Sequence, residues 1–209
     1  MLTAIGNVMR ELHTRGWITT RDGNISLCRH SKRTMYITPS GWRKSIIHPE
    51  HIVKVMLTEE GMEIPEGQKP SGELHMHWLL QKNSVETRAV VHAHPTNTIA
   101  AMYRGYDLMK LCDQFPEIFR YTRVGPTVKA YPAVSKALGR ATARAFDLKG
   151  DGGIEYDIVG QANHGVTAVA SDPWSAFEHI ERLEHICQIV LLSGVSPEEV
   201  ELRPPVPRN

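Results

Sequence analysis

Two histidines, spaced two residues apart in an apolar segment, constrain the fold of this chain most strongly. They lie in Val90-Val91-His92-Ala93-His94-Pro95, which has the character of a short buried strand. Because side chains alternate between the two faces of a strand, His92 and His94 project from the same face. Proline cannot donate to a strand ladder, so Pro95 ends the strand. The segment therefore predicts a strand that ends at a cleft and presents two imidazoles to a metal ion.

A single histidine on an apolar strand is usually a hydrogen-bonded core residue, whereas two in register beside a loop favour a metal site. Two other segments offer further ligands. Glu73 follows Lys69-Pro70-Ser71-Gly72 in the first turn of a predicted helix over 74–80, where Ser71 is placed to cap it. His164 lies at the connection between predicted strands at 156–160 and 166–170. Three imidazoles and one carboxylate suit Zn²⁺ or a similar divalent ion, provided that the fold brings them together.

Length, charge and cysteine content exclude several classes of protein. A chain of 209 residues with 41% hydrophobic residues can bury a core as one domain spanning 1–209. The formal net charge is +1 and no basic stripe is present, so we expect no nucleic-acid partner. No leader and no apolar stretch of membrane-spanning length is recognised, which predicts a cytoplasmic protein without a membrane partner. The three cysteines lack paired spacing and are expected to be buried thiols.

Helical and strand patterns alternate along the chain. The predicted helices are 2–12, 74–80, 96–103, 135–146 and one that opens at Asp172-Pro173 and closes at Gly194. The predicted strands are 25–27, 35–37, 52–57, 90–94, 156–160 and 166–170. This order predicts an α/β fold in which an antiparallel-dominated sheet lies between helical layers.

Two glycine-containing loops flank the first predicted hairpin. They are Asp22-Gly23-Asn24-Ile25-Ser26 and Thr38-Pro39-Ser40-Gly41, and each offers small polar side chains and backbone N–H groups. Such groups can bind a phosphate without any cation, although each loop alone is also typical of an ordinary turn. Arg43 and Lys44 follow the second loop and are either anion contacts or solvated surface charges.

The chain resembles the class II aldolase and adducin family, because five of its motifs occur in the order and approximate spacing of that family's motifs. They are Gly23-Asn24-Ile25-Ser26, Thr38-Pro39-Ser40-Gly41, Lys69-Pro70-Ser71-Gly72-Glu73, His92-Ala93-His94 and Asn163-His164-Gly165. Five ordered motifs are far more specific than any one of them. The resemblance covers nearly the whole chain, and the motif pattern is most similar to that of the L-fuculose-1-phosphate aldolase branch.

The resemblance implies a fold, an assembly and a set of site residues. The fold is a three-layer α/β/α sandwich with a mostly antiparallel central sheet, and the assembly is a homotetramer with active sites between subunits. The implied ligands of a catalytic Zn²⁺, or of Mn²⁺, Co²⁺ or Fe²⁺ in its place, are Glu73, His92, His94 and His164. The implied phosphate pocket consists of Asn24, Ser40, Gly41, Ser71 and Gly72. Because the fuculose enzymes carry a second serine where this chain has Gly72, one phosphate contact must come from the backbone or be lost.

The resemblance also implies a reaction. A small phosphorylated sugar, a ketose 1-phosphate, is cleaved to dihydroxyacetone phosphate and an aldehyde through a metal-stabilised enediolate. Glu73 leaves the metal as the substrate binds and then serves as acid and base. A tyrosine of a neighbouring subunit protonates the leaving oxygen, and Tyr121 is the candidate for that role.

Other members of the family use the same kind of metal site differently. A methylthioribulose-1-phosphate dehydratase branch uses an acidic residue in the region of Tyr121, where Asp107 and Glu117 are equal candidates. A decarboxylase of a 3-oxo-tetronate phosphate and an epimerase are further alternatives. A non-catalytic, adducin-like module is less consistent with this chain, which keeps the full set of metal ligands. His77, one helical turn after Glu73, is predicted to support the site or the packing rather than bind the metal.

Overall fold

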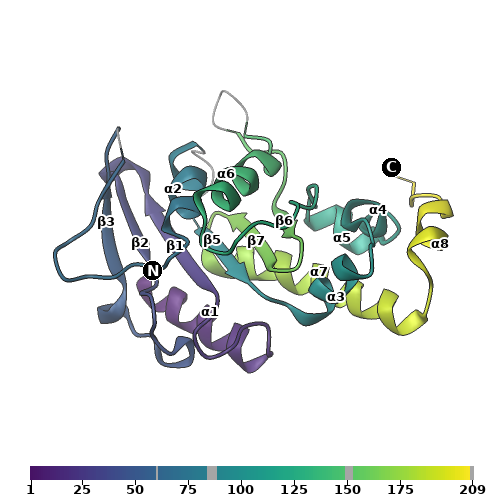
Figure 1. Ribbon diagram of the computed structural model, residues 1–209, viewed down its shortest axis with the longest axis horizontal. Coiled ribbons are helices and arrows are strands. Elements are labelled where there is room, and N and C mark those ends of the chain that lie inside the picture. Colours follow the sequence, from purple (N-terminus) through teal and green to yellow (C-terminus); the bar gives the residue numbers. More distant parts are fainter. Residues whose placement is uncertain (60, 84–88, 149–152, 208–209) are drawn as a thin grey trace.

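A sheet in which every adjacent pair of strands runs antiparallel crosses the molecule and separates two layers of helices (Figure 1). This computed structural model describes residues 1–59, 61–83, 89–148 and 153–207. Over these residues the sheet has seven strands in the order β4-β3-β2-β1-β5-β7-β6. The strands are β1 (Asn24–Arg29), β2 (Thr34–Ile37), β3 (Val53–Leu57), β4 (Met62–Glu63), β5 (Ala89–Ala93), β6 (Ile158–Gln161) and β7 (Gly165–Ala170).

The helices cover both faces of the sheet, as expected for an α/β/α sandwich. They are α1 (Leu2–Thr14), α2 (Leu74–Asn83), α3 (Thr96–Tyr103), α4 (Leu108–Cys112), α5 (Pro116–Tyr121), α6 (Lys136–Ala145), α7 (Pro173–Ser193) and α8 (Pro197–Leu202). Helices α1, α3 and α7 pack on one face, and α2 and α6 pack on the other (Figure 1). The expectations of an α/β class and of a mostly antiparallel central sheet are therefore confirmed.

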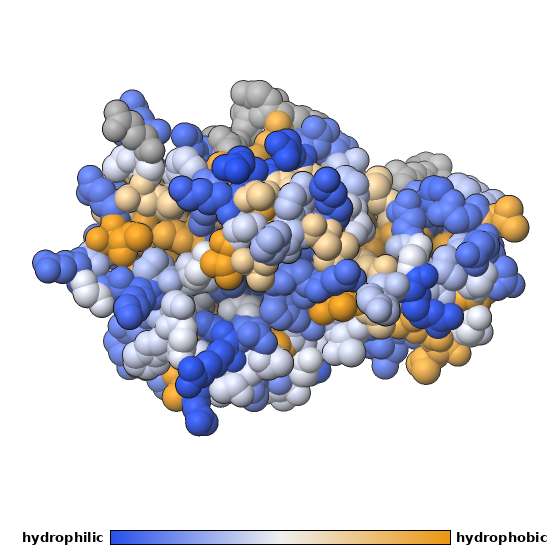
Figure 2. All heavy atoms as spheres, in the orientation of Figure 1, coloured by the Kyte–Doolittle hydropathy of each residue, from blue (hydrophilic) through white to orange (hydrophobic). Residues whose placement is uncertain are grey.

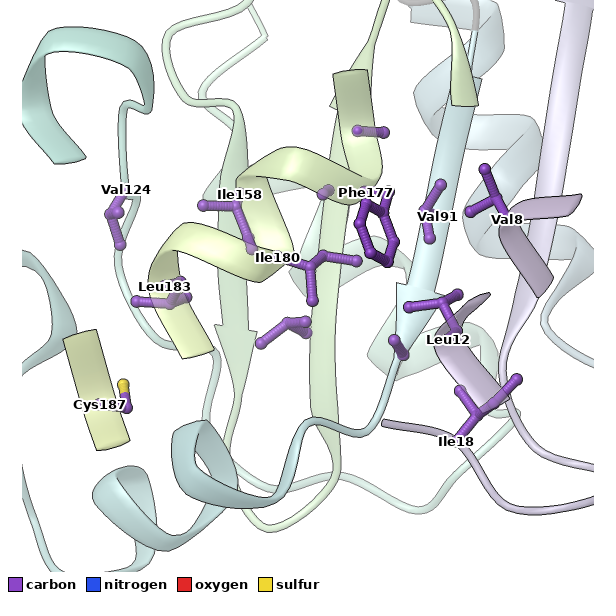
Figure 3. Packing of buried hydrophobic residues seen from close by; sticks show 14 of the residues in the cluster. Val8, Leu12, Ile18, Val91, Val124, Ile158, Phe177, Ile180, Leu183 and Cys187 are labelled. Atoms are coloured by element: carbon purple, nitrogen blue, oxygen red, sulfur yellow. The ribbon is translucent and has the colours of Figure 1, made fainter. Parts of the chain in front are cut away.

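Strand β5 shows how one segment serves both layers. Val91 points into the larger apolar cluster, which contains Phe177 and Ile180 of α7 (Figure 3). Val90 points the other way, into the cluster formed with α2 and α6. Because side chains alternate, His92 lies on the same face as Val90, beneath α2. One side of β5 thus packs only in the larger apolar cluster, whereas the other side carries both Val90, which packs in the smaller cluster, and the polar His92.

The long helix α7 begins and ends where the sequence predicts. Asp172 is the N-cap of the helix, and its carboxylate accepts hydrogen bonds from the backbone N–H groups of Trp174 and Ser175. Gly194 adopts a left-handed conformation with φ of 72° at the other end, a conformation that glycine adopts without a steric penalty.

Two local details differ from the sequence-based prediction. Helix α2 begins at Leu74, so Glu73 directly precedes the helix instead of lying in its first turn. The Ser71 hydroxyl accepts a hydrogen bond from the backbone N–H of Glu73 at 3.3 Å, and it therefore stabilises the turn before the helix. The short helices α4, α5 and α8 were not predicted, because segments of five or six residues are too short to show helical periodicity.

The hydrophilic surface and the buried cysteines agree with what the composition predicts. Figure 2 shows a face on which hydrophilic side chains predominate, with separate apolar groups, one of them where α7 gives way to α8. Within the described residues, no helix is both long and apolar enough to cross a membrane. Cys28, Cys112 and Cys187 are buried free thiols, as expected.

We predict that Ile180→Ala lowers the free energy of unfolding by about 2–5 kcal/mol, because Ile180 is fully buried between α7 and the sheet. Urea denaturation followed by circular dichroism measures the change. Gln188→Ala, an exposed position on the same helix, is the matched control and should change stability by less than about 0.5 kcal/mol. Equal effects of the two substitutions would contradict the assigned core.

Candidate metal centre

The end of β5 holds two of the predicted ligands side by side. His92 is buried and pairs across the sheet with Asn24 of β1 and Thr167 of β7. His94 directly follows the strand, and its backbone N–H donates to the carbonyl of Trp17 at 2.8 Å. The Nε2 atoms of His92 and His94 are 2.8 Å apart. The alternation predicted for the His-x-His segment thus places both ring nitrogens at one point.

The third histidine reaches the same point from the tight connection between β6 and β7. Asn163 has a left-handed backbone with φ of 58°, and the N–H of His164 donates to the carbonyl of Gln161 at 3.0 Å. The next residue must be glycine, because a Cβ at Gly165 would lie 2.3 Å from the carbonyl oxygen of Ala93. This close approach to the end of β5 brings the His164 ring near those of His92 and His94, with ring centroids 4.9 and 5.0 Å apart.

Glu73 completes the group from the start of α2. Its Oε2 lies 3.2 Å from Nε2 of His92, and its Oε1 lies 3.2 Å from Nε2 of His164. Nitrogen atoms of the three histidines all lie within 4.8 Å of one another. The structure therefore brings together all four side chains that the sequence nominates as ligands.

The donor set fits a divalent ion. His92 Nδ1 lies 2.9 Å from the carbonyl oxygen of Val166, which can only accept a hydrogen bond, so Nδ1 carries the ring proton and Nε2 of His92 presents a lone pair to the other ligands. Zinc bonds of about 2.0–2.1 Å in a tetrahedral site separate the ligand atoms by roughly 3.3 Å. Three of the distances between ligand atoms, at 2.8, 3.2 and 3.2 Å, are close to that separation, and the three histidine nitrogens lie within 4.8 Å of one another.

The protonation states also suit a cation. Burial lowers the pKa of His92, and it lowers the pKa of His94 to about 3, so both imidazoles are neutral at neutral pH. Burial alone would raise the pKa of the Glu73 carboxyl, but the adjacent His92, His164 and Asn24 hold it well below its ordinary value. Neutral imidazoles and an ionised carboxylate are the forms that bind a metal ion.

A cavity of about 250 Å³ opens beside these ligands. Its walls contain every residue of the predicted phosphate pocket, namely Asn24, Ser40, Gly41, Ser71 and Gly72. Two backbone hydrogen bonds hold the two loops together, from Ser40 N–H to the Lys69 carbonyl at 2.9 Å and from Ser71 N–H to the Thr38 carbonyl at 3.0 Å. Segments 30 residues apart in sequence thereby form one wall of small polar groups.

Lys44 is a buried cation in the same cavity wall. The sequence alone does not distinguish an anion contact from a surface charge at this position. Its ammonium group donates to the carbonyl of Pro39 at 2.8 Å, which leaves donors available for another acceptor. Burial lowers the pKa of Lys44 to about 8, while the nearby Asp22 opposes that shift. The cavity therefore offers a positive charge in addition to neutral donors.

Gly72 is required by a neighbouring side chain. A Cβ at this position would lie 2.8 Å from Cγ1 of Val134, which also lines the cavity. Val134 has φ of 64°, a left-handed conformation that is strained for a β-branched residue. A serine at position 72 would not fit unless Val134 moved, so only the backbone of Gly72 can contact a ligand there.

The three candidates for a further acid lie outside the cavity of their own chain. Tyr121 is 54% exposed at the end of α5, and its ring lies beneath the guanidinium groups of Arg120 and Arg182. Asp107 caps α4 by accepting from the N–H groups of Met109 and Lys110. Glu117 is exposed in the first turn of α5. None of these three residues lines the cavity beside the predicted ligands.

Comparison with known proteins supplies independent information. The family model described as "Class II Aldolase and Adducin N-terminal domain" matches residues 3–191. The chain is 30% identical to a 5-deoxy-D-ribulose 1-phosphate aldolase of Bacillus thuringiensis over 80% of this chain and 73% of that protein. It is 28% identical to a 3-oxo-tetronate 4-phosphate decarboxylase of Pectobacterium atrosepticum, over 86% of this chain and 78% of the relative. It is also 28% identical to a methylthioribulose-1-phosphate dehydratase of Acidiphilium cryptum, over 88% and 85%.

A solved structure gives the same result for the fold. The crystal structure of L-fuculose-1-phosphate aldolase from Thermus thermophilus superposes with a TM-score of 0.74 at 25% identity, covering 92% of this chain and 94% of that one. The named relatives are lyases, but they catalyse different reactions.

Removing a residue that hydrogen-bonds a metal ligand typically weakens metal binding roughly 10- to 100-fold. We predict that His92→Ala weakens zinc binding by more than this, because His92 is itself a ligand. His75→Ala is the matched control, because His75 is another histidine of α2 whose ring lies beside Gly139 of α6 and does not belong to the histidine group. Zinc content after dialysis against a metal buffer measures the difference. Full zinc content in the His92 variant would remove this residue from the metal centre.

Proposed function

The chain belongs to the class II aldolase and adducin family, and on this premise we propose that it is a metal-dependent aldolase acting on a small phosphorylated ketose. The observation that carries the proposal is the meeting of four ligand side chains beside a cavity with phosphate-binding character. One end of this cavity suits a carbonyl compound that binds a metal, and the other suits an anion. A ketose 1-phosphate contains both groups at neighbouring carbons.

Zinc is the proposed ion, held by Glu73, His92, His94 and His164. When bound, a divalent ion acts as a Lewis acid that polarises the carbonyl group and stabilises developing negative charge. An imidazole binds a metal ion in its neutral form, so the three histidines leave most of the positive charge of the ion uncompensated, and Glu73 supplies the single negative charge among the four ligands.

The residues of the chain itself supply orientation and proton transfer. Ser40, Ser71 and the backbone of Gly72 donate hydrogen bonds to the phosphate, and Lys44 adds a charge-assisted contact. Fixing the phosphate end holds the reacting carbons near the metal ligands, which lowers the entropy cost of the reaction. Glu73 acts as acid and base at the carbon beside the carbonyl, and Tyr121 of a neighbouring subunit protonates the leaving oxygen.

Assembly into a homotetramer is part of the proposal, because Tyr121 can reach a site only in another subunit. The exposed apolar side chains Ile189, Leu192 and Leu202 lie on α7 and α8, and they are available for contact between subunits. Helix α5, which carries Tyr121, packs against α7, and α8 follows the end of α7 at the same end of the molecule (Figure 1).

Aldol cleavage is the reaction that we propose, and the identity of 30% to a 5-deoxy-D-ribulose 1-phosphate aldolase supports it. Decarboxylation of a phosphorylated 3-oxo sugar acid is the second candidate, supported by the decarboxylase relative with 28% identity. Both reactions break a carbon–carbon bond beside a carbonyl group and use the same end of the cavity. Dehydration of a ketose 1-phosphate is the third.

The reaction is tested with zinc-loaded protein and three classes of substrate. We predict condensation of dihydroxyacetone phosphate with small aldehydes, and no condensation when unphosphorylated dihydroxyacetone is used. Mass spectrometry of the products measures both. Release of CO₂ from a 3-oxo sugar-acid phosphate, or loss of water from a ketose 1-phosphate, in the absence of condensation would replace the aldolase assignment.

Lys44→Met should raise KM for the phosphorylated substrate roughly tenfold or more, since a hydrogen bond to a charged group contributes about 1.5–3 kcal/mol. Arg43→Met is the control, because Arg43 is exposed next to the same loop. With the pKa of Lys44 near 8, the lysine is charged below that pH and loses its charge as the pH rises through it. The wild-type kcat/KM should therefore fall above pH about 8.

Asp22, Arg21 and Glu73 also line the cavity around Lys44, and the first of them favours its charged form. The alkaline fall in kcat/KM should be absent from the Lys44→Met variant and present in the Arg43→Met variant. An unchanged KM in Lys44→Met, with the alkaline fall retained, would exclude Lys44 from the phosphate site.

A further inference from the structure

Beneath the metal centre, four polar residues are buried between β1 and α2. Ser26, His77 and Gln81 have no exposed surface, and Asn24 is 6% exposed. Asn24 and Ser26 project from β1 on the face beneath α2, while His77 and Gln81 lie one helical turn apart on α2. A buried polar group is costly unless it has a hydrogen-bond partner, so the connections among these four side chains need an explanation.

The Glu73 carboxylate determines the orientation of the Asn24 amide and, through it, the tautomer of His77. An ionised carboxylate can only accept hydrogen bonds, so the group 3.1 Å from its Oε2 must be the amide nitrogen of Asn24. The amide oxygen of Asn24 then faces Nε2 of His77. Because an amide oxygen only accepts, Nε2 of His77 must carry the ring proton.

The directions of the remaining hydrogen bonds follow from that tautomer. With its proton on Nε2, the neutral His77 ring has a lone pair on Nδ1, which accepts from the Ser26 hydroxyl at 2.7 Å. The Ser26 oxygen in turn accepts from the side-chain amide of Gln81 at 3.2 Å. Every hydrogen bond along the path Gln81, Ser26, His77, Asn24 and Glu73 therefore donates in one direction, toward the carboxylate.

We propose that His77 is a positioning residue, which fixes the Asn24 amide and through it the orientation of the Glu73 carboxylate. The proposal deepens the proposed function, since it rests on Glu73 as a ligand and base of that site. Asn24 cannot rotate while its oxygen is held by His77, because an exchanged amide would place its nitrogen against a donor. The second hydrogen on the same nitrogen remains for the cavity that Asn24 also lines.

This arrangement gives Asn24 two functions at once. One N–H of its amide holds Glu73, and the other can donate to the phosphate of the substrate. The Asn24 amide, which His77 holds in one orientation, thereby connects the anion end of the cavity to the carboxylate at the metal end. A histidine that merely filled space beneath the sheet would affect stability but would leave the carboxylate orientation unchanged.

The test compares two substitutions at position 77 with a buried control. His77→Gln can place an amide N–H where Nε2 stands and so keep the donor to Asn24. His77→Met has similar bulk but no donor. Thr142→Val is the matched control, because it removes a buried hydrogen bond, from Gln161 to Thr142 at 2.8 Å, in the same helical layer.

The readouts are zinc affinity, measured by competition with a chelator, and the visible absorption spectrum of the Co²⁺-loaded protein. His77→Met should weaken zinc binding about 10- to 100-fold and alter the Co²⁺ spectrum. His77→Gln should restore most of the affinity and the wild-type spectrum. Thr142→Val should lower the unfolding midpoint without changing either readout.

Wild-type zinc affinity and an unaltered Co²⁺ spectrum in a folded His77→Met variant would overturn the proposal. If that variant does not fold, the ¹⁵N signals of His77 in the wild-type protein decide the matter: a proton on Nε2 supports the path, and a proton on Nδ1 contradicts it. These readouts do not need turnover. A failure to act on any sugar phosphate would therefore refute the proposed function while leaving the His77 test intact.

Discussion

The position of β5 between β1 and β7 determines where both the apolar core and the metal ligands lie. One face of this strand packs Val91 against α1 and α7, and the other face carries His92 beneath α2. A shift of one residue in register would bury the imidazole in the apolar cluster and expose the valine to the polar site. The hydrophobic packing of one layer therefore sets the geometry of the ligands in the other.

The same constraint explains why the centre is polar yet ordered. Neighbouring strands place Asn24 and Thr167 beside His92, so three polar side chains from three strands share one face. Asn24 and Thr167 find partners on α2, in His77 and Met76. The first residues of α2 follow a loop that hydrogen bonds hold against the first hairpin. Close approaches at Gly72 and Gly165 leave no room for a Cβ, which lets the loops meet around the ligands.

Much of this arrangement could be predicted from sequence, because the signals are local. The His-x-His strand, the caps of α7 and the ordered motifs each depend on neighbouring residues. The hydrogen bonds around His77 join residues about 50 positions apart, so no local pattern reveals them. The burial of Lys44 likewise depends on how its loop folds back onto Pro39 and Thr20, and a charged residue after a turn gives no sign of that. The strained Val134 is set by tertiary packing against Gly72.

Anomalous diffraction at the zinc absorption edge, from crystals of the zinc-loaded protein, would show whether the four side chains at the end of β5 bind the ion. We expect one strong peak per chain, about 2.0–2.1 Å from the Nε2 atoms of His92, His94 and His164. In the absence of substrate, a Glu73 oxygen should complete the coordination. A peak elsewhere, or no peak at the end of β5 under saturating zinc, would contradict it.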